Sequence, residues 1–152
     1  MNPFAAYSRE QLRRAYTEAW SKRRAGAPLA PLQSMIADVV EMHPEYQGLV
    51  QDAHAALTAG GDAAGARENP FLHMGLHLAV GEQLSIDRPP GVRALHRQLL
   101  AACGDPHAAL HALMQALGET LWEAERRGAA PDERHYLELA RRNLGRAPSR
   151  RG

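Results

Sequence analysis

The longest nearly apolar segment of the chain is NPFLHMGLHLAVGEQLSIDRPPG, residues 69–91. Asn69 is a favourable N-cap, and Pro70 suits the first helical position because the amide hydrogen that proline lacks would be unpaired there. At 100° per residue, apolar side chains fall on every side of the helix that follows. A helix of this kind is buried, so the segment predicts a central helix over residues 70–86.

The rest of the chain repeats apolar residues at helical spacing, and prolines and glycines separate the repeats. Residues that favour helices are common, whereas β-branched residues are sparse. A length of 152 residues suits one domain with a hydrophobic core of its own. The sequence therefore predicts an all-α, single-domain bundle of about five to six helices, near residues 8–24, 31–43, 70–86, 91–103, 106–127 and 131–144.

We expect the bundle domain to cover residues 1–145, with a flexible basic tail at 146–152 and a long irregular stretch at 51–68. The last twelve residues carry five arginines and no acid, so the overall charge of +1 leaves −4 for the rest of the chain. A body of that sign is a poor surface for nucleic acids. The expected partner is a small molecule or a protein, and the oligomeric state is left open.

The number of cysteines and the hydropathy of the chain indicate the cellular compartment of the protein. Cys103 is the single cysteine, so no intrachain disulfide can form, which is typical of a reducing environment. The N-terminal residues MNPFAAYSREQLRR lack the apolar core of a signal peptide, and no run approaches the roughly 18 apolar residues of a membrane span. The sequence therefore predicts a cytoplasmic protein without membrane contact.

Two histidine pairs lie at corresponding places near the starts of two predicted helices. The two imidazoles of each pair are four residues apart, so they project from the same helix face. Helices joined by short turns are antiparallel, so the two helices that carry the pairs, with one helix between them, are predicted to be parallel. A fifth histidine ends the predicted helix at 31–43. The predicted cluster contains His43, His73, His77, His107 and His111.

Histidines four residues apart on a helix are a recurrent metal-ligand pattern, because two neutral imidazoles one turn apart can reach one ion at about 2.0–2.1 Å. A site made of histidines suits zinc, nickel or iron. The sequence therefore predicts a metal-binding helical bundle, with one divalent first-row ion as the candidate cofactor. A water bound to that ion could make the protein an enzyme of unknown substrate, and no catalytic residue is assigned.

A second interpretation gives the same histidines a structural role. Helix N-termini carry partial positive charge, which disfavours a cation and suits histidines that stay neutral in a core or face an anion. The protein would then be a non-catalytic interaction or scaffold protein; haem or an anionic ligand is a further alternative. Outside the cluster, we predict His96 as a hydrogen-bonded core residue, His54 and His135 at the surface, and Met114 and Trp122 in the core.

Several motifs can be compared with known families: HPEY at 43–46, the segment at 69–91, the His107/His111 segment through Glu119 and Trp122, and PDERHYL at 131–137. Together they resemble a bacterial family catalogued as domain of unknown function eighteen forty-one. The resemblance covers nearly the whole chain and implies a single domain, and the family supplies no established activity. A histidine often follows the HPEY tyrosine in that family, whereas this chain has Gln47. A looser, fold-level likeness to DinB-like three-histidine bundles favours a metal.

Overall fold

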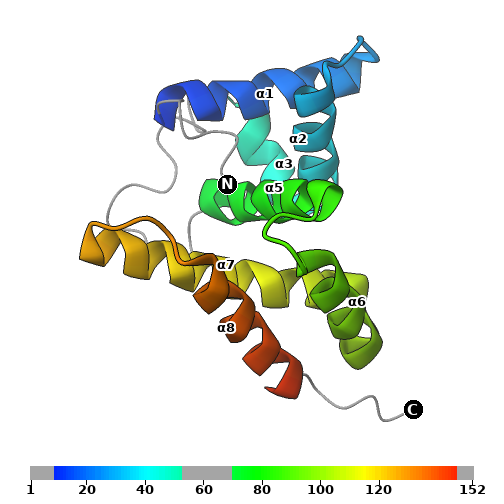
Figure 1. Cartoon of the computed structure of the whole chain (residues 1–152). Coiled ribbons are helices and arrows are strands. Elements are labelled where there is room, and N and C mark those ends of the chain that lie inside the picture. The colour runs from blue at the N-terminus through cyan, green and yellow to red at the C-terminus, as the bar shows by residue number, and fades with distance from the viewer. Residues whose placement is uncertain (1–8, 53–69, 147–152) are drawn as a thin grey trace. The chain divides into compact units, whose positions relative to one another are not determined.

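The structure, a computed structural model, describes residues 9–52 and 70–146. These residues form seven helices and no strand (Figure 1), which confirms the predicted all-α class. The predicted irregular stretch from Ala53 onward and the tail from residue 147 lie outside the described residues. The helices are α1 (Arg9–Ala25), α2 (Pro31–Glu41), α3 (Pro44–Gln51), α5 (Pro70–Ile86), α6 (Val92–Cys103), α7 (Pro106–Arg127) and α8 (Glu133–Arg146).

The chain divides into two compact units, residues 1–78 and residues 79–152. Unit 1 contains α1, α2, α3 and the first half of α5. Unit 2 contains the second half of α5 together with α6, α7 and α8. The single domain over residues 1–145 stays a prediction.

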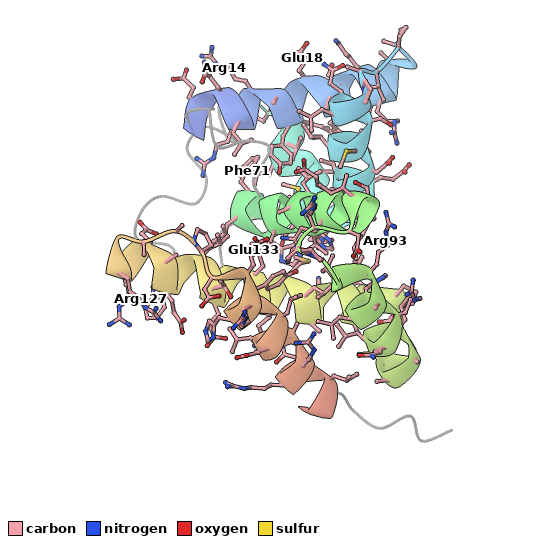
Figure 2. All side chains as sticks on the ribbon, in the orientation of Figure 1. Arg14, Glu18, Phe71, Arg93, Arg127 and Glu133 are labelled. Carbon is pink, nitrogen blue, oxygen red and sulfur yellow. The ribbon has the colours of Figure 1, made fainter. Side chains whose placement is uncertain are left out.

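Aromatic and aliphatic side chains from all four of its helical segments form the core of unit 1. Phe71 on α5 meets the ring of Tyr16 on α1 edge-on, with the ring centroids 5.4 Å apart. In Figure 2, Phe71 lies on the side of α5 that faces α1, whereas Arg14 and Glu18 point away from the core. Phe71 therefore anchors α5 to α1. The cluster consists of Tyr16, Ala19, Trp20, Ile36, Ala37, Val39, Val40, Val50, Phe71, Met74 and Leu78.

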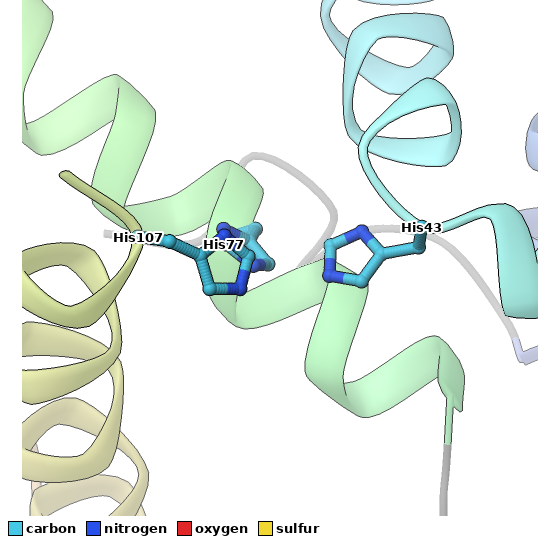
Figure 3. A group of neighbouring side chains, drawn as sticks. All are labelled: His43, His77 and His107. Carbon is cyan, nitrogen blue, oxygen red and sulfur yellow. The ribbon is translucent and has the colours of Figure 1, made fainter. Parts of the chain in front are cut away.

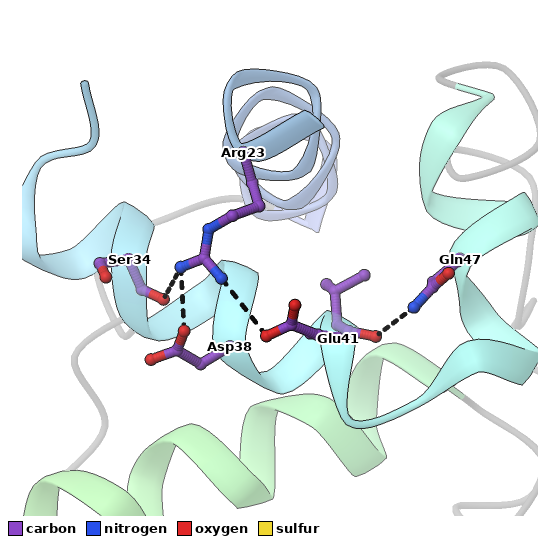
Figure 4. A network of polar contacts seen from close by, with 6 residues as sticks. Arg23, Ser34, Asp38, Glu41 and Gln47 are labelled. Carbon is purple, nitrogen blue, oxygen red and sulfur yellow. Dashed lines mark hydrogen bonds and ion pairs between the residues drawn. The ribbon is translucent and has the colours of Figure 1, made fainter. Parts of the chain in front are cut away.

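Arg23 on α1 fastens α2 in place (Figure 4). Its Nη2 donates to Oδ1 of Asp38 at 2.9 Å and to the carbonyl oxygen of Ser34 at 3.4 Å. Its Nη1 lies 3.5 Å from Oε2 of Glu41. The planar guanidinium can reach these acceptors at once because its donors form a rigid fork. Arg23 thus holds the last turns of α2, directly before His43.

This clamp gives a first prediction. We expect Arg23→Lys to lower the free energy of unfolding by about 0.5–1 kcal/mol, because a single ammonium group cannot span the same acceptors and the pairs are partly exposed to water. Urea unfolding followed by circular dichroism measures the change. Arg14→Lys is the matched control, since the ion pair of Arg14 among the described residues is with Glu10, on the surface of its own helix. Equal losses at both positions would contradict the clamp.

In unit 2, the corner after α5 is built by Asp87 and Arg93. The Arg93 guanidinium donates to the carbonyl oxygens of Leu84 and Ser85, each at 2.7 Å, so it satisfies carbonyls that the end of a helix leaves unpaired. Asp87 has a φ of 52°, a left-handed conformation that aspartate tolerates better than most residues. Its carboxylate accepts from the Arg93 amide at 3.1 Å. The corner thereby closes α5 and starts α6.

Local caps set the bounds of α7 and α8. The Asp105 carboxylate accepts from the amides of His107 and Ala108 at the start of α7, as its sequence position predicts. Asp132 caps α8 in the same way, so α8 begins at Glu133 rather than at residue 131. The hydroxyl of buried Tyr136 on α8 donates to Oε1 of Gln83 at 2.6 Å, and burial raises the pKa of that hydroxyl.

Two sequence predictions about the helices were wrong. The second helix ends at Glu41 rather than residue 43, because a residue before proline is disfavoured in helical conformation; Pro44 then starts α3, a full helix of eight residues. The central helix α5 is not buried on every side, since Leu72 is 41% exposed and Ile86 58% exposed. Apolar residues on a helix therefore do not by themselves show that each side is covered.

Candidate metal site

Three of the five predicted histidines lie together within unit 1. His43 lies between α2 and α3, and its ring points toward His77 on α5 (Figure 3). The ring centroid of His43 lies 5.0 Å from that of His73 and 4.8 Å from that of His77, and the last two centroids are 5.0 Å apart. His43 and His77 are buried and His73 is half-buried. The prediction that His43 joins the pair on α5 agrees with this geometry.

The nitrogen atoms of the three rings are close enough for metal coordination. The Nε2 atoms of His43 and His73 are 3.1 Å apart. A ring nitrogen of His77 lies within 4.8 Å of one in His43, and one lies within 4.8 Å of His73. Two nitrogens bound at about 2.0–2.1 Å to a tetrahedral zinc ion are roughly 3.3 Å apart. The His43–His73 separation is close to that edge length.

The backbone fixes the tautomer of His43. Its Nδ1 lies 2.7 Å from the carbonyl oxygen of Val39, one helical turn earlier. A carbonyl only accepts, so Nδ1 carries the hydrogen and donates it. The Nε2 of a neutral His43 then presents its lone pair to His73. Metal-binding histidines in proteins almost always have this arrangement, with one nitrogen on the metal and the other donating to an acceptor.

Tyr46 on the first turn of α3 lines the same group of rings. Its ring is nearly parallel to that of His43, with centroids 5.2 Å apart and an interplanar angle of 11°. It also meets His73 edge-on at 6.1 Å. Burial, and then the neighbouring charge of Glu45, raise the pKa of the Tyr46 hydroxyl. The tyrosine therefore stays a neutral phenol, packed against two of the three histidines.

His107 and His111 form a second group, within unit 2. Both are on the first two turns of α7, and their ring centroids are 4.1 Å apart. Their shared helix face agrees with the spacing argument. Their membership in one site with His43, His73 and His77 stays a prediction.

The three histidines outside the predicted cluster have different surroundings. His96 on α6 is half-buried, and burial lowers its pKa, but within residues 9–52 and 70–146 it has none of the hydrogen bonds that we predicted. His135 is not a freely solvated surface residue, because its Nε2 lies 2.8 Å from Oε2 of Glu123 and its side chain is only 28% exposed. His54 lies outside the described residues. No sequence signal had paired His135 with Glu123, since the two are on different helices.

Sequence reasoning missed Tyr46 as part of the site. The HPEY motif contains it, but the motif does not specify how its ring packs against those of His43 and His73. The spacing was the available signal. His43 is the N-cap of α3, and Tyr46, three residues later, lies on the first turn of that helix.

The fold and the site define an all-helical protein with a cluster of histidines. The chain belongs to the family described as domain of unknown function (DUF1841), whose model matches residues 8–142. That description assigns the family no activity. The match confirms the resemblance of the sequence motifs. Comparison with curated proteins and with solved structures finds no match.

Among the helices that the structure describes, none has both the length and the apolar character needed to cross a membrane.

Proposed function

We propose that the protein binds one divalent first-row metal ion through His43, His73 and His77. The observation that carries the proposal is the 3.1 Å separation of the His43 and His73 Nε2 atoms, combined with the Val39 carbonyl behind His43. Together they provide the ligand distance and the outer hydrogen bond that histidine metal sites use. An all-nitrogen ligand set suits zinc, nickel or iron.

His107 and His111 are proposed as further ligands of the same ion, on the strength of the sequence argument. They repeat the four-residue spacing and the cap-plus-proline helix start of the first pair. With three histidine ligands, a zinc ion would keep a position for water and could lower the pKa of that water to about 7. Hydrolytic chemistry of this kind would make the protein an enzyme; with all five ligands, the site would favour a structural role.

The test is the metal content of protein purified without a histidine tag. We expect elemental analysis to find about one zinc, nickel or iron ion per chain, and a stripped sample to regain one equivalent of Zn²⁺ in a titration against a chromophoric chelator. The expectation follows from ligand atoms already held near coordination distance, so little ordering is needed on binding. Protein that neither contains nor takes up an ion would refute the proposal.

One observation supports a different function. The His43–His73 distance of 3.1 Å also fits a hydrogen bond from the Nε2–H of His73 to the lone pair of His43. The histidines would then be satisfied core residues of a non-catalytic interaction or scaffold protein. The two functions separate cleanly, because a hydrogen-bonded pair predicts no metal uptake and a melting temperature that does not depend on zinc.

A further inference from the structure

His43 differs from the other two histidines of unit 1 in its backbone. His73 and His77 are fixed by α5, whereas His43 lies between α2 and α3 with φ −125° and ψ 74°. Its imidazole is therefore not oriented by a surrounding helix, and contacts to the ring must hold it. One contact is the Nδ1 bond to the Val39 carbonyl at the ring edge. A hydrogen bond at the ring edge fixes the direction of Nδ1 but does not by itself fix the tilt of the ring plane about that bond.

The contact on the ring face comes from Tyr46. The two rings are nearly parallel at 5.2 Å between centroids, which is an offset stack. The amide of Tyr46 donates to the carbonyl oxygen of His43 at 2.9 Å, so the first turn of α3 fixes the tyrosine relative to the histidine. The same tyrosine ring is also in T-shaped contact with the ring of His73, with the centroids 6.1 Å apart. One side chain thus contacts both imidazoles whose Nε2 atoms are 3.1 Å apart.

We propose that Tyr46 is the positioning residue of the metal site. The flat face of its ring keeps His43 oriented so that Nδ1 stays on the Val39 carbonyl and Nε2 stays directed at His73. The ring performs this role and the hydroxyl does not. The proposal rests on the proposed function for its effect on metal affinity, but its effect on His43 can be measured without metal.

Two substitutions separate the flat ring from simple apolar bulk. Tyr46→Phe keeps the stack, and Tyr46→Leu keeps a comparable apolar volume without a flat face. We expect Tyr46→Phe to bind Zn²⁺ within about threefold of the wild type in chelator competition. We expect Tyr46→Leu to bind about 10–100-fold more weakly, the usual cost of losing a residue that orients a metal ligand. The absorption of bound Co²⁺ should change for Tyr46→Leu alone.

A measurement on the metal-free protein makes the test independent of metal binding. Long-range ¹H–¹⁵N spectra report which nitrogen of His43 carries the hydrogen. We expect a fixed Nδ1–H tautomer in the wild type and in Tyr46→Phe, and a mixture of tautomers in Tyr46→Leu. Both variants should melt within a few degrees of the wild type, since Tyr46 is only half-buried.

The outcomes are distinct. Equal zinc affinity and an unchanged His43 tautomer in Tyr46→Leu would overturn the positioning role. A loss in Tyr46→Phe as large as that in Tyr46→Leu would also overturn it, because the hydroxyl would then be the essential group. Wild-type protein that binds no zinc would refute the proposed function, and the tautomer measurement would then decide the role of Tyr46 by itself.

Discussion

Val80→Asp is expected to leave most of the protein unfolded at neutral pH. Val80 is fully buried on the second half of α5. A carboxylate at this position must either lose its water or take up a proton, and each costs free energy. We expect a loss of more than about 4 kcal/mol, which is most of the stability of an ordinary domain. Far-UV circular dichroism and urea unfolding measure it.

Ile86→Asp is the matched control for that substitution. It introduces the same charge on the same helix, but Ile86 is 58% exposed, so the carboxylate stays hydrated. We expect a change below about 1 kcal/mol, including the unfavourable interaction with the carboxyl end of the helix. An unchanged unfolding midpoint for Val80→Asp would mean that this face of α5 is not part of a core.

Helix positions could be predicted from the sequence because each relies on local signals. A proline at the first helical position and a glycine in left-handed conformation mark the two ends of α7, which begins at Pro106 and ends before Gly128, as predicted.

The predicted exposure of single side chains was less accurate. Trp122 is 56% exposed, and its ring stacks with the Arg126 guanidinium at 4.6 Å instead of entering the core. Met114 is buried as predicted.

The candidate site could be predicted in part, for a physical reason. A four-residue spacing places His73 beside His77 in any α-helix, so that contact follows from the sequence alone. The contact of His43 with His73 spans thirty residues and depends on how α2, α3 and α5 pack. The contact of Tyr46 with His73 depends in the same way on how α3 packs against α5. Contacts that depend on packing between helices carry no local sequence signal.

The largest effects on metal binding are expected for the three histidines of unit 1. His43→Ala, His73→Ala and His77→Ala should each weaken Zn²⁺ binding by more than about 100-fold, since removing only the residue behind a ligand already costs about 10–100-fold. Zinc should also be released as the pH falls below about 5, because a protonated imidazole nitrogen has no lone pair for the ion. A chromophoric chelator measures both.

His96→Ala and His135→Ala are the matched controls, because each removes an imidazole from a position outside the proposed ligand set. They should bind Zn²⁺ as tightly as the wild type.

His107→Ala and His111→Ala decide how far the site extends: weakened binding would support the five-histidine site that the sequence predicts, and unchanged binding would restrict the ligands to unit 1. Wild-type Zn²⁺ affinity in all three of the His43, His73 and His77 variants would contradict the site, since removing a ligand must weaken the binding of the ion.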